Sequence, residues 1–107
     1  MVIEWLEFQV PVADRERYVQ LDDQVWTSAL QGYPGFLSKE AWIDPHDLER
    51  VVFVIQWQSR EAWKAIPETE LTAIEQCFDE AFQAPYQLIA SREFQMRRFP
   101  TGPITPR

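Results

Sequence analysis

The stretch Val51-Val52-Phe53-Val54-Ile55-Gln56-Trp57 is the most continuously apolar run of this 107-residue chain. Most of its residues are β-branched or aromatic, which favours extended backbone. A short apolar run without alternation is typical of a strand whose two faces are both covered. The stretch therefore predicts a central strand of a sheet.

A second strand of this kind is predicted at the start of the chain, over Val2–Val10. Its alternation is imperfect, because Leu6 and Phe8 fall on one face while Ile3 and Trp5 fall on the other. Both faces of this strand are therefore expected to be largely covered as well.

A helix is predicted after this first strand, which Pro11 ends. Asp14 is placed to cap it, and it runs to about Leu30, where the segment 31–35 closes it with two glycines and a proline. The apolar stripe expected to face the core consists of Tyr18, Leu21, Val25 and Ala29.

The segment 36–43 predicts a strand, and the polar segment 44–50 predicts the hairpin loop that joins it to the central run. Beyond that run, Ser59 is placed to cap a short helix to about residue 66. A second helix is predicted over about 69–82, followed by a strand over about 86–99.

The order strand, helix, strand, strand, helix, strand is that of the ferredoxin-like β-α-β-β-α-β fold, an α+β fold with an antiparallel four-stranded sheet. We expect one such domain over residues 1–99 and a Pro-rich C-terminal tail over 100–107. In this topology the first and third strands, here the most apolar, occupy the middle of the sheet. Helices cover only one face, so a second copy of the sheet is the expected cover of the other. The sequence therefore predicts a homodimer, a dimeric α/β barrel.

Composition excludes several classes of function. A net charge of −7 argues against a nucleic-acid partner, and no apolar run is long enough to span a membrane. The start of the chain does not have the pattern of a signal peptide, so a cytoplasmic location is expected. One cysteine and one histidine cannot form a disulfide or a Cys/His zinc site within the chain. No metal or other cofactor is expected.

Several motifs resemble a family of short, uncharacterised proteins found mainly in cyanobacteria. They are the opening Met1–Leu6, Tyr33-Pro34-Gly35-Phe36, the segment 57–67 and the segment 91–99. That family is similar to the dimeric α/β-barrel superfamily, which includes antibiotic-biosynthesis-type monooxygenases. The resemblance implies the fold; it implies no single reaction, since the superfamily includes cofactor-free oxygenases of quinol-like substrates, haem-degrading enzymes, isomerases and dehydratases.

The tryptophans are the candidate ligand-binding residues. Trp5 and Trp57 lie on the two strands expected to be adjacent, and Trp26 and Trp63 lie on the two helices expected to cover them. If the four side chains converge, they enclose an apolar cavity suited to a small aromatic molecule. Ordinary core packing explains the same four residues.

Two residues are candidates for acid/base chemistry. Glu4 shares a face with Leu6, so burial would raise the pKa of its carboxyl group and make it a base; alternatively it pairs with Arg92. His46 is the only histidine, and histidine is the side chain that ordinarily titrates near neutral pH. It lies in the predicted hairpin loop, so the alternative is a solvated loop residue without a role in chemistry.

Cys77 is expected beside the apolar stripe of the last helix as a small core residue, with haem ligation as the alternative. The acidic residues of the same region predict a solvated helix face. They are Glu68, Glu70, Glu75, Asp79 and Glu80.

Two functions follow as hypotheses. The first is a protein that holds a small apolar or aromatic ligand between sheet and helices. The second is a cofactor-independent monooxygenase-like enzyme, without haem or metal, that acts on a quinol-like or aromatic molecule.

Overall fold

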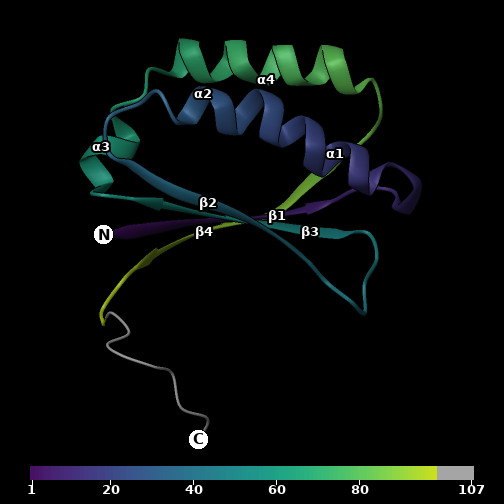
Figure 1. The fold of residues 1–107 in the computed structure, drawn as a ribbon, viewed down its shortest axis with the longest axis horizontal. Helices are drawn as coiled ribbons and strands as arrows, with labels where there is room; N and C mark the ends of the chain where they lie inside the picture. The colour runs from purple at the N-terminus through teal and green to yellow at the C-terminus, as the bar shows by residue number, and fades with distance from the viewer. Residues whose placement is uncertain (99–107) are drawn as a thin grey trace, which may run out of the picture.

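A computed structural model describes residues 1–98 as a four-stranded antiparallel sheet with helices on one face (Figure 1). The strand order is β2-β3-β1-β4, and every neighbouring pair is antiparallel. This confirms the ferredoxin-like fold, with the first and third strands at the centre. The predicted tail over 100–107 lies outside the described residues. The strands are β1 Val2–Gln9, β2 Phe36–Ile43, β3 Arg50–Trp57 and β4 Gln87–Gln95.

The pairing of β1 with β3 assigns the side chains to the two faces of the sheet. Leu6 lies opposite Phe53, and both contribute to the core beneath the helices. Trp5 lies opposite Val54 in the next pair along, so it points to the other face, because strand side chains alternate. The two central strands thus supply apolar residues to both faces, as predicted.

The predicted first helix is a continuous rod of four segments. They are a 3₁₀ turn η1 (Val12–Asp14), α1 (Arg15–Asp22), a π-helical segment η2 (Asp23–Thr27) and α2 (Ser28–Leu30). A π-helical turn is wider than an α-helical one, so residues four apart remain on one face. Leu21 and Val25 of the predicted stripe pack against the core as expected and are partly buried. The row that faces the sheet is Tyr18, Asp22, Trp26 and Leu30.

The predicted caps have different outcomes. Asp14 occupies the N-cap position of α1 but makes no capping hydrogen bond, and its carboxylate accepts one from Arg17 instead. Ser59 caps α3 (Arg60–Lys64) as predicted, because its hydroxyl accepts a hydrogen bond from the backbone N–H of Ala62. Gly35 is required at its position, since its φ is +89° and an added Cβ would overlap that of Ala62.

Helix α4 (Glu68–Phe82) packs on the sheet through Phe78 and Phe82, which are fully buried against Tyr18. The prediction that Cys77 is a core residue is wrong, because its side chain is exposed. The buried row of α4 passes through Phe78, and the neighbouring residue is rotated by about 100° around the helix axis.

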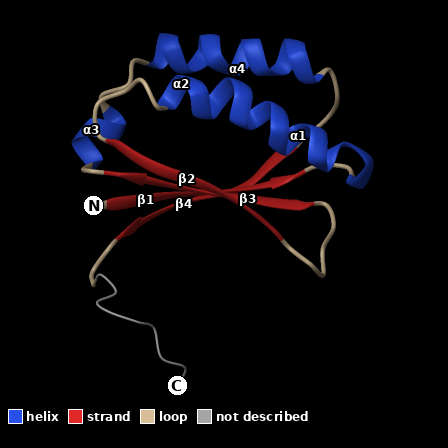
Figure 2. Cartoon of the chain, viewed as in Figure 1, coloured by secondary structure: helices blue, strands red, loops and turns tan. Residues whose placement is uncertain are grey.

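The face of the sheet opposite the helices carries no covering layer among the described residues (Figure 2). Two large apolar side chains on it, Trp42 and Phe94, are each 49% exposed. The guanidinium of Arg92 lies 5.2 Å from the centre of the Trp5 ring on the same face. We call this surface the open face; its apolar residues are Ile3, Trp5, Trp42, Val52, Val54 and Phe94. No helix within residues 1–98 has the length and apolar character needed to cross a membrane.

Candidate functional site

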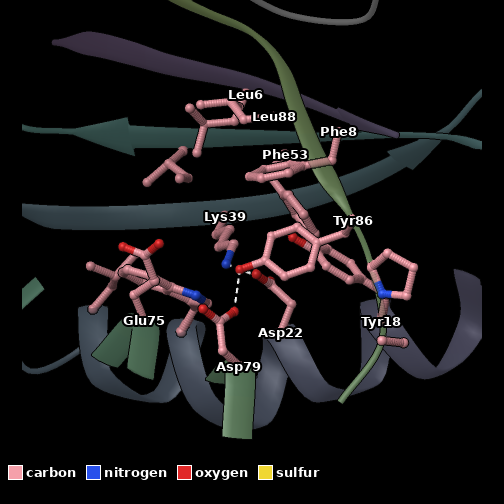
Figure 3. A pocket seen from close by; sticks show the side chains of 15 residues that line it. Leu6, Phe8, Tyr18, Asp22, Lys39, Phe53, Glu75, Asp79, Tyr86 and Leu88 are labelled. Carbon is pink, nitrogen blue, oxygen red and sulfur yellow. Dashed lines mark hydrogen bonds and ion pairs between the residues drawn. The ribbon is translucent and has the colours of Figure 1, made fainter. Parts of the chain in front are cut away.

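A cavity of about 590 Å³ lies between the sheet and the helices (Figure 3). This volume is in the range of sites that hold drug-sized molecules. Its sheet side is lined by Leu6, Phe8, Phe53, Ile55 and Leu88, and its helix side by Tyr18, Asp22, Trp26 and Leu30. The remaining lining residues are Lys39, Glu75, Asp79, Ala84, Pro85 and Tyr86.

Most of this lining is aromatic or aliphatic. Phe8 is 5.7 Å from Tyr18 and 5.9 Å from Phe53, measured between ring centres, and Tyr86 lies 5.1 Å from Tyr18. Rings at these distances in tilted and edge-on arrangements form a rigid wall. The walls of the cavity are therefore largely apolar and aromatic.

One buried ion pair interrupts this apolar lining. Lys39 extends from β2 toward α1, and its Nζ lies 2.5 Å from Oδ2 of Asp22 (Figure 3). The two side chains are only 5% and 7% exposed. The ammonium group also lies 4.8 Å from the centre of the Phe53 ring, a distance at which a cation is attracted to the ring. The pair links the edge strand of the sheet to the helix that covers it.

Burial dominates the electrostatics of this pair. Loss of solvent raises the pKa of the Asp22 carboxyl group, while the charge and hydrogen bond of Lys39 lower it by less. The neighbouring carboxylate of Asp23 adds to the increase. Asp22 is therefore a stronger base than a solvated aspartate, and it lines the cavity.

Two tyrosines and two acids complete the polar part of the cavity. The hydroxyl of Tyr86 donates a hydrogen bond to Oδ1 of Asp79. Burial raises the pKa of Tyr18 and of Tyr86, so both hydroxyls remain protonated at neutral pH. Glu75 and Asp79 belong to the predicted solvated face of α4 and are indeed exposed, yet both reach the rim of the cavity.

Comparison with known protein families identifies the family of this chain. A sequence model described as "Antibiotic biosynthesis monooxygenase" matches residues 1–71, about two-thirds of the chain. The chain belongs to the antibiotic biosynthesis monooxygenase family. Members of this family are often monooxygenases that act on small molecules. No curated protein matches the chain by sequence.

Several solved structures share the fold of this chain at low sequence identity. A monooxygenase from the gene ActVA-Orf6 of Streptomyces coelicolor, in complex with nanaomycin D, superimposes with a TM-score of 0.67 and is 19% identical over 98% of this chain and 91% of that one. SnoaB, a cofactor-independent oxygenase from Streptomyces nogalater, gives a TM-score of 0.68 in a mutant form, with 16% identity over 92% and 94% of the two chains. A conserved protein of Methanosarcina mazei is also similar, with a TM-score of 0.63 and 10% identity over 90% and 92%.

In this family member the four predicted tryptophans do not all converge. Trp57 is fully buried in a core cluster against which Trp26 and Trp63 pack, and Trp26 also lines the cavity. Trp5 lies on the open face, because Leu6 and Phe8 occupy the cavity face of the same strand. The predicted convergence is therefore wrong for Trp5. A ligand-binding role of the four tryptophans stays a prediction.

The carboxylate of Glu4 accepts a hydrogen bond of 3.2 Å from Nε1 of Trp57, and burial raises its pKa. The alternative pairing with Arg92 is wrong, since Arg92 lies over Trp5 on the other face. Glu93, the β4 neighbour of Glu4, pairs with Arg60. Glu4 therefore has the expected basicity, but it is not among the residues that line the cavity.

His46 and Cys77 are exposed and do not line this cavity. The backbone N–H of His46 donates to Oδ1 of Asp44, which fixes the hairpin loop and lowers the pKa of that aspartate. Among residues 1–98, no group of three or more His, Cys, Asp and Glu side chains is arranged to hold a metal ion.

The Asp22–Lys39 pair was not predicted, although the sequence contains a signal for it. Asp22 lies four residues after Tyr18 and four before Trp26, so it interrupts an aromatic row of the helix. Lys39 lies on the helix-facing side of β2, because a register shift after Phe36 changes the alternation of that strand. The shift could not be inferred from the sequence pattern.

Proposed function

We propose that this protein binds a small, planar aromatic molecule in the cavity between sheet and helices. The observation that carries the proposal is the aromatic lining of a preformed space of about 590 Å³, interrupted by one buried ion pair. Sites for small molecules combine apolar walls with a few placed polar groups in this way. The acidic rim at Glu75 and Asp79 disfavours a molecule that enters as an anion.

A substitution that fills the cavity tests this proposal. Ala84 lines the cavity, and we expect Ala84→Phe to weaken binding of the methyl ether of a nitronaphthol, an uncharged aromatic probe, at least about tenfold. Quenching of tryptophan fluorescence during a titration measures the affinity.

Ala81→Phe is the matched control, since Ala81 is exposed on α4 and does not line the cavity. It is expected to bind like the unmodified protein. Equal affinity in all three proteins, or no binding by the unmodified protein, would contradict the proposal.

A second candidate function is monooxygenation without a cofactor. The family match and the description of SnoaB as a cofactor-independent oxygenase support it. Without an external reductant, the substrate itself must supply all the electrons that reduce O₂. Conversion of an activated CH₂ group to a carbonyl meets this balance, because one oxygen atom enters the product and the other leaves as water with the two hydrogens.

An anthrone has such a CH₂ group between two aromatic rings and is the substrate to test. We expect consumption of one O₂ per dihydroxyanthrone molecule and transfer of isotopically labelled oxygen to the new carbonyl. We expect Ala84→Phe to slow the reaction and Ala81→Phe to leave it unchanged. Accumulation of hydrogen peroxide instead of incorporation, or a rate independent of protein, would count against this function.

The open face supports a further part of the proposal, that two copies pair sheet to sheet as a dimeric α/β barrel. Trp42 and Phe94 leave large apolar areas in contact with water in a single chain. Exposed apolar patches of this kind mark interaction surfaces. A two-fold axis through the open face would place each such residue against the same surface of the second copy.

A further inference from the structure

The Asp22–Lys39 pair also borders a second hollow, of about 290 Å³. Asp22, Lys39 and Phe53 line both spaces, so these three side chains form the partition between them. The remaining residues of the second hollow are Val19, Gln20, Asp23, Thr27 and Ala41. The pair therefore has the aromatic cavity on one side and a partly polar space on the other.

Lys39 is the one cationic side chain that lines either space, among the residues that the structure describes. An anionic group on a bound molecule would therefore be stabilised next to Lys39 and opposed elsewhere by the acids. The other titratable groups that face the two spaces are Tyr18, Asp23, Glu75, Asp79 and Tyr86.

We infer that Asp22 accepts the proton of an acidic hydroxyl on the bound aromatic molecule and that Lys39 holds the resulting anion. This inference rests on the proposed function of the cavity. The O–H bond of the molecule breaks, its electron pair stays on the molecule's oxygen, and the proton forms a bond to a carboxylate oxygen of Asp22. The ammonium of Lys39 then turns from the neutral carboxyl group to the new anion.

Charge conservation explains why a pair serves this step better than a lone carboxylate. Before and after the transfer, the partition holds one ammonium and one anion, so no additional charge is created away from water. The raised pKa of Asp22 reduces the difference in proton affinity that the transfer must overcome. A delocalised phenolate or enolate also loses less solvation on burial than a carboxylate does, since its charge is spread over more atoms.

The second hollow completes the proton path. Gln20, Asp23 and Thr27 line the second hollow together with Asp22 and do not line the aromatic cavity. A proton held by Asp22 can therefore exchange with solvent there without crossing the space that the molecule occupies.

The test compares a nitronaphthol with its methyl ether, at a pH where the free naphthol is uncharged. The naphtholate is coloured, so the absorption spectrum of the bound probe reports its ionisation. Calorimetry in buffers of different ionisation enthalpy reports the protons released on binding. The unmodified protein is expected to turn the probe into the coloured anion without net proton release, and to bind it about tenfold more tightly than the ether.

Variants of Asp22 and Lys39 distinguish the role of the proton acceptor from that of the cation. Asp22→Asn is expected to give the coloured anion with release of about one proton to the buffer, because the acceptor is absent. Lys39→Met is expected to leave the bound probe colourless and to abolish its advantage over the ether. Lys39→Arg keeps the positive charge and is expected to retain the colour.

A colourless naphthol bound to the unmodified protein would overturn the inference without any variant, and so would colour that persists in Lys39→Met. If the naphthol and the ether bind equally and without colour, the aromatic cavity stands and only the proton transfer fails. If neither probe binds, the proposed function fails, and the inference falls with it.

Discussion

Replacing Lys39 by methionine is expected to destabilise the folded protein by about 3–5 kcal/mol at neutral pH, the usual cost of removing one partner of a buried ion pair. Asp22 would remain as a carboxylate that is only 7% exposed and has no compensating charge beside it. Chemical denaturation followed by tryptophan fluorescence measures the loss.

The loss of stability caused by Lys39→Met should become smaller as the pH falls. Burial raises the pKa of Asp22 above its value in the unfolded chain, and removal of Lys39 raises it further. Between the two pKa values the folded chain binds more protons than the unfolded chain, so stability falls as the pH rises through this range. The penalty should therefore be smallest near pH 4, about the ordinary pKa of aspartate, and grow toward neutral pH.

Two controls define this prediction. Lys64→Met removes the other lysine of the chain, which is exposed, and should cost less than about 1 kcal/mol. The double variant Asp22→Asn with Lys39→Met should recover most of the stability, because no buried charge is left alone. A single-variant loss that is small and independent of pH would show that the pair is not buried in solution.

Replacing Val52 by arginine is expected to convert the proposed dimer into monomers. Val52 lies on β3, at the centre of the open face, between Glu7 of β1 and Trp42 of β2. A two-fold interface would have to bury two long, charged side chains in place of two valines, a steric and desolvation cost that the neighbouring Glu7 offsets only in part. This should raise the dissociation constant at least about a hundredfold. Sedimentation velocity at micromolar concentration measures the change.

Leu48→Arg is the control for this experiment, because Leu48 is equally apolar but is exposed in the hairpin loop. It should leave the dimer intact. An unmodified chain that sediments as a monomer, or a Val52→Arg chain that remains dimeric, would contradict sheet-to-sheet pairing.

The fold could be predicted from the sequence because its main determinants are local. The run from Val51 to Trp57 specifies a central strand by its length and continuous apolar character. Ser59 and Gly35 mark a helix start and a tight turn by backbone chemistry that few other residues satisfy. Together with the order of the elements, such signals specify the topology.

The candidate site was harder to predict from the sequence because it depends on two departures from regular geometry. The π-helical segment aligns Asp22 with the aromatic row of the first helix, and the register shift in β2 turns Lys39 toward that row. The four-residue spacing of Tyr18, Asp22 and Trp26 is a signal of the first departure, whereas the register shift leaves no pattern that periodicity detects. The convergence predicted for Trp5 failed for the opposite reason, since regular alternation places it on the open face, away from Leu6 and Phe8.

Binding inside the cavity is tested most directly by NMR, through the indole N–H signals of the five tryptophans. Trp26 lines the cavity, whereas Trp5 and Trp42 lie on the open face. Titration with the methyl ether of nitronaphthol should shift the Trp26 signal, assigned by a Trp26→Phe variant, and leave those of Trp5 and Trp42 in place. A Trp26 signal that stays unchanged at saturation, or a largest shift at Trp5 or Trp42, would contradict a binding site between sheet and helices.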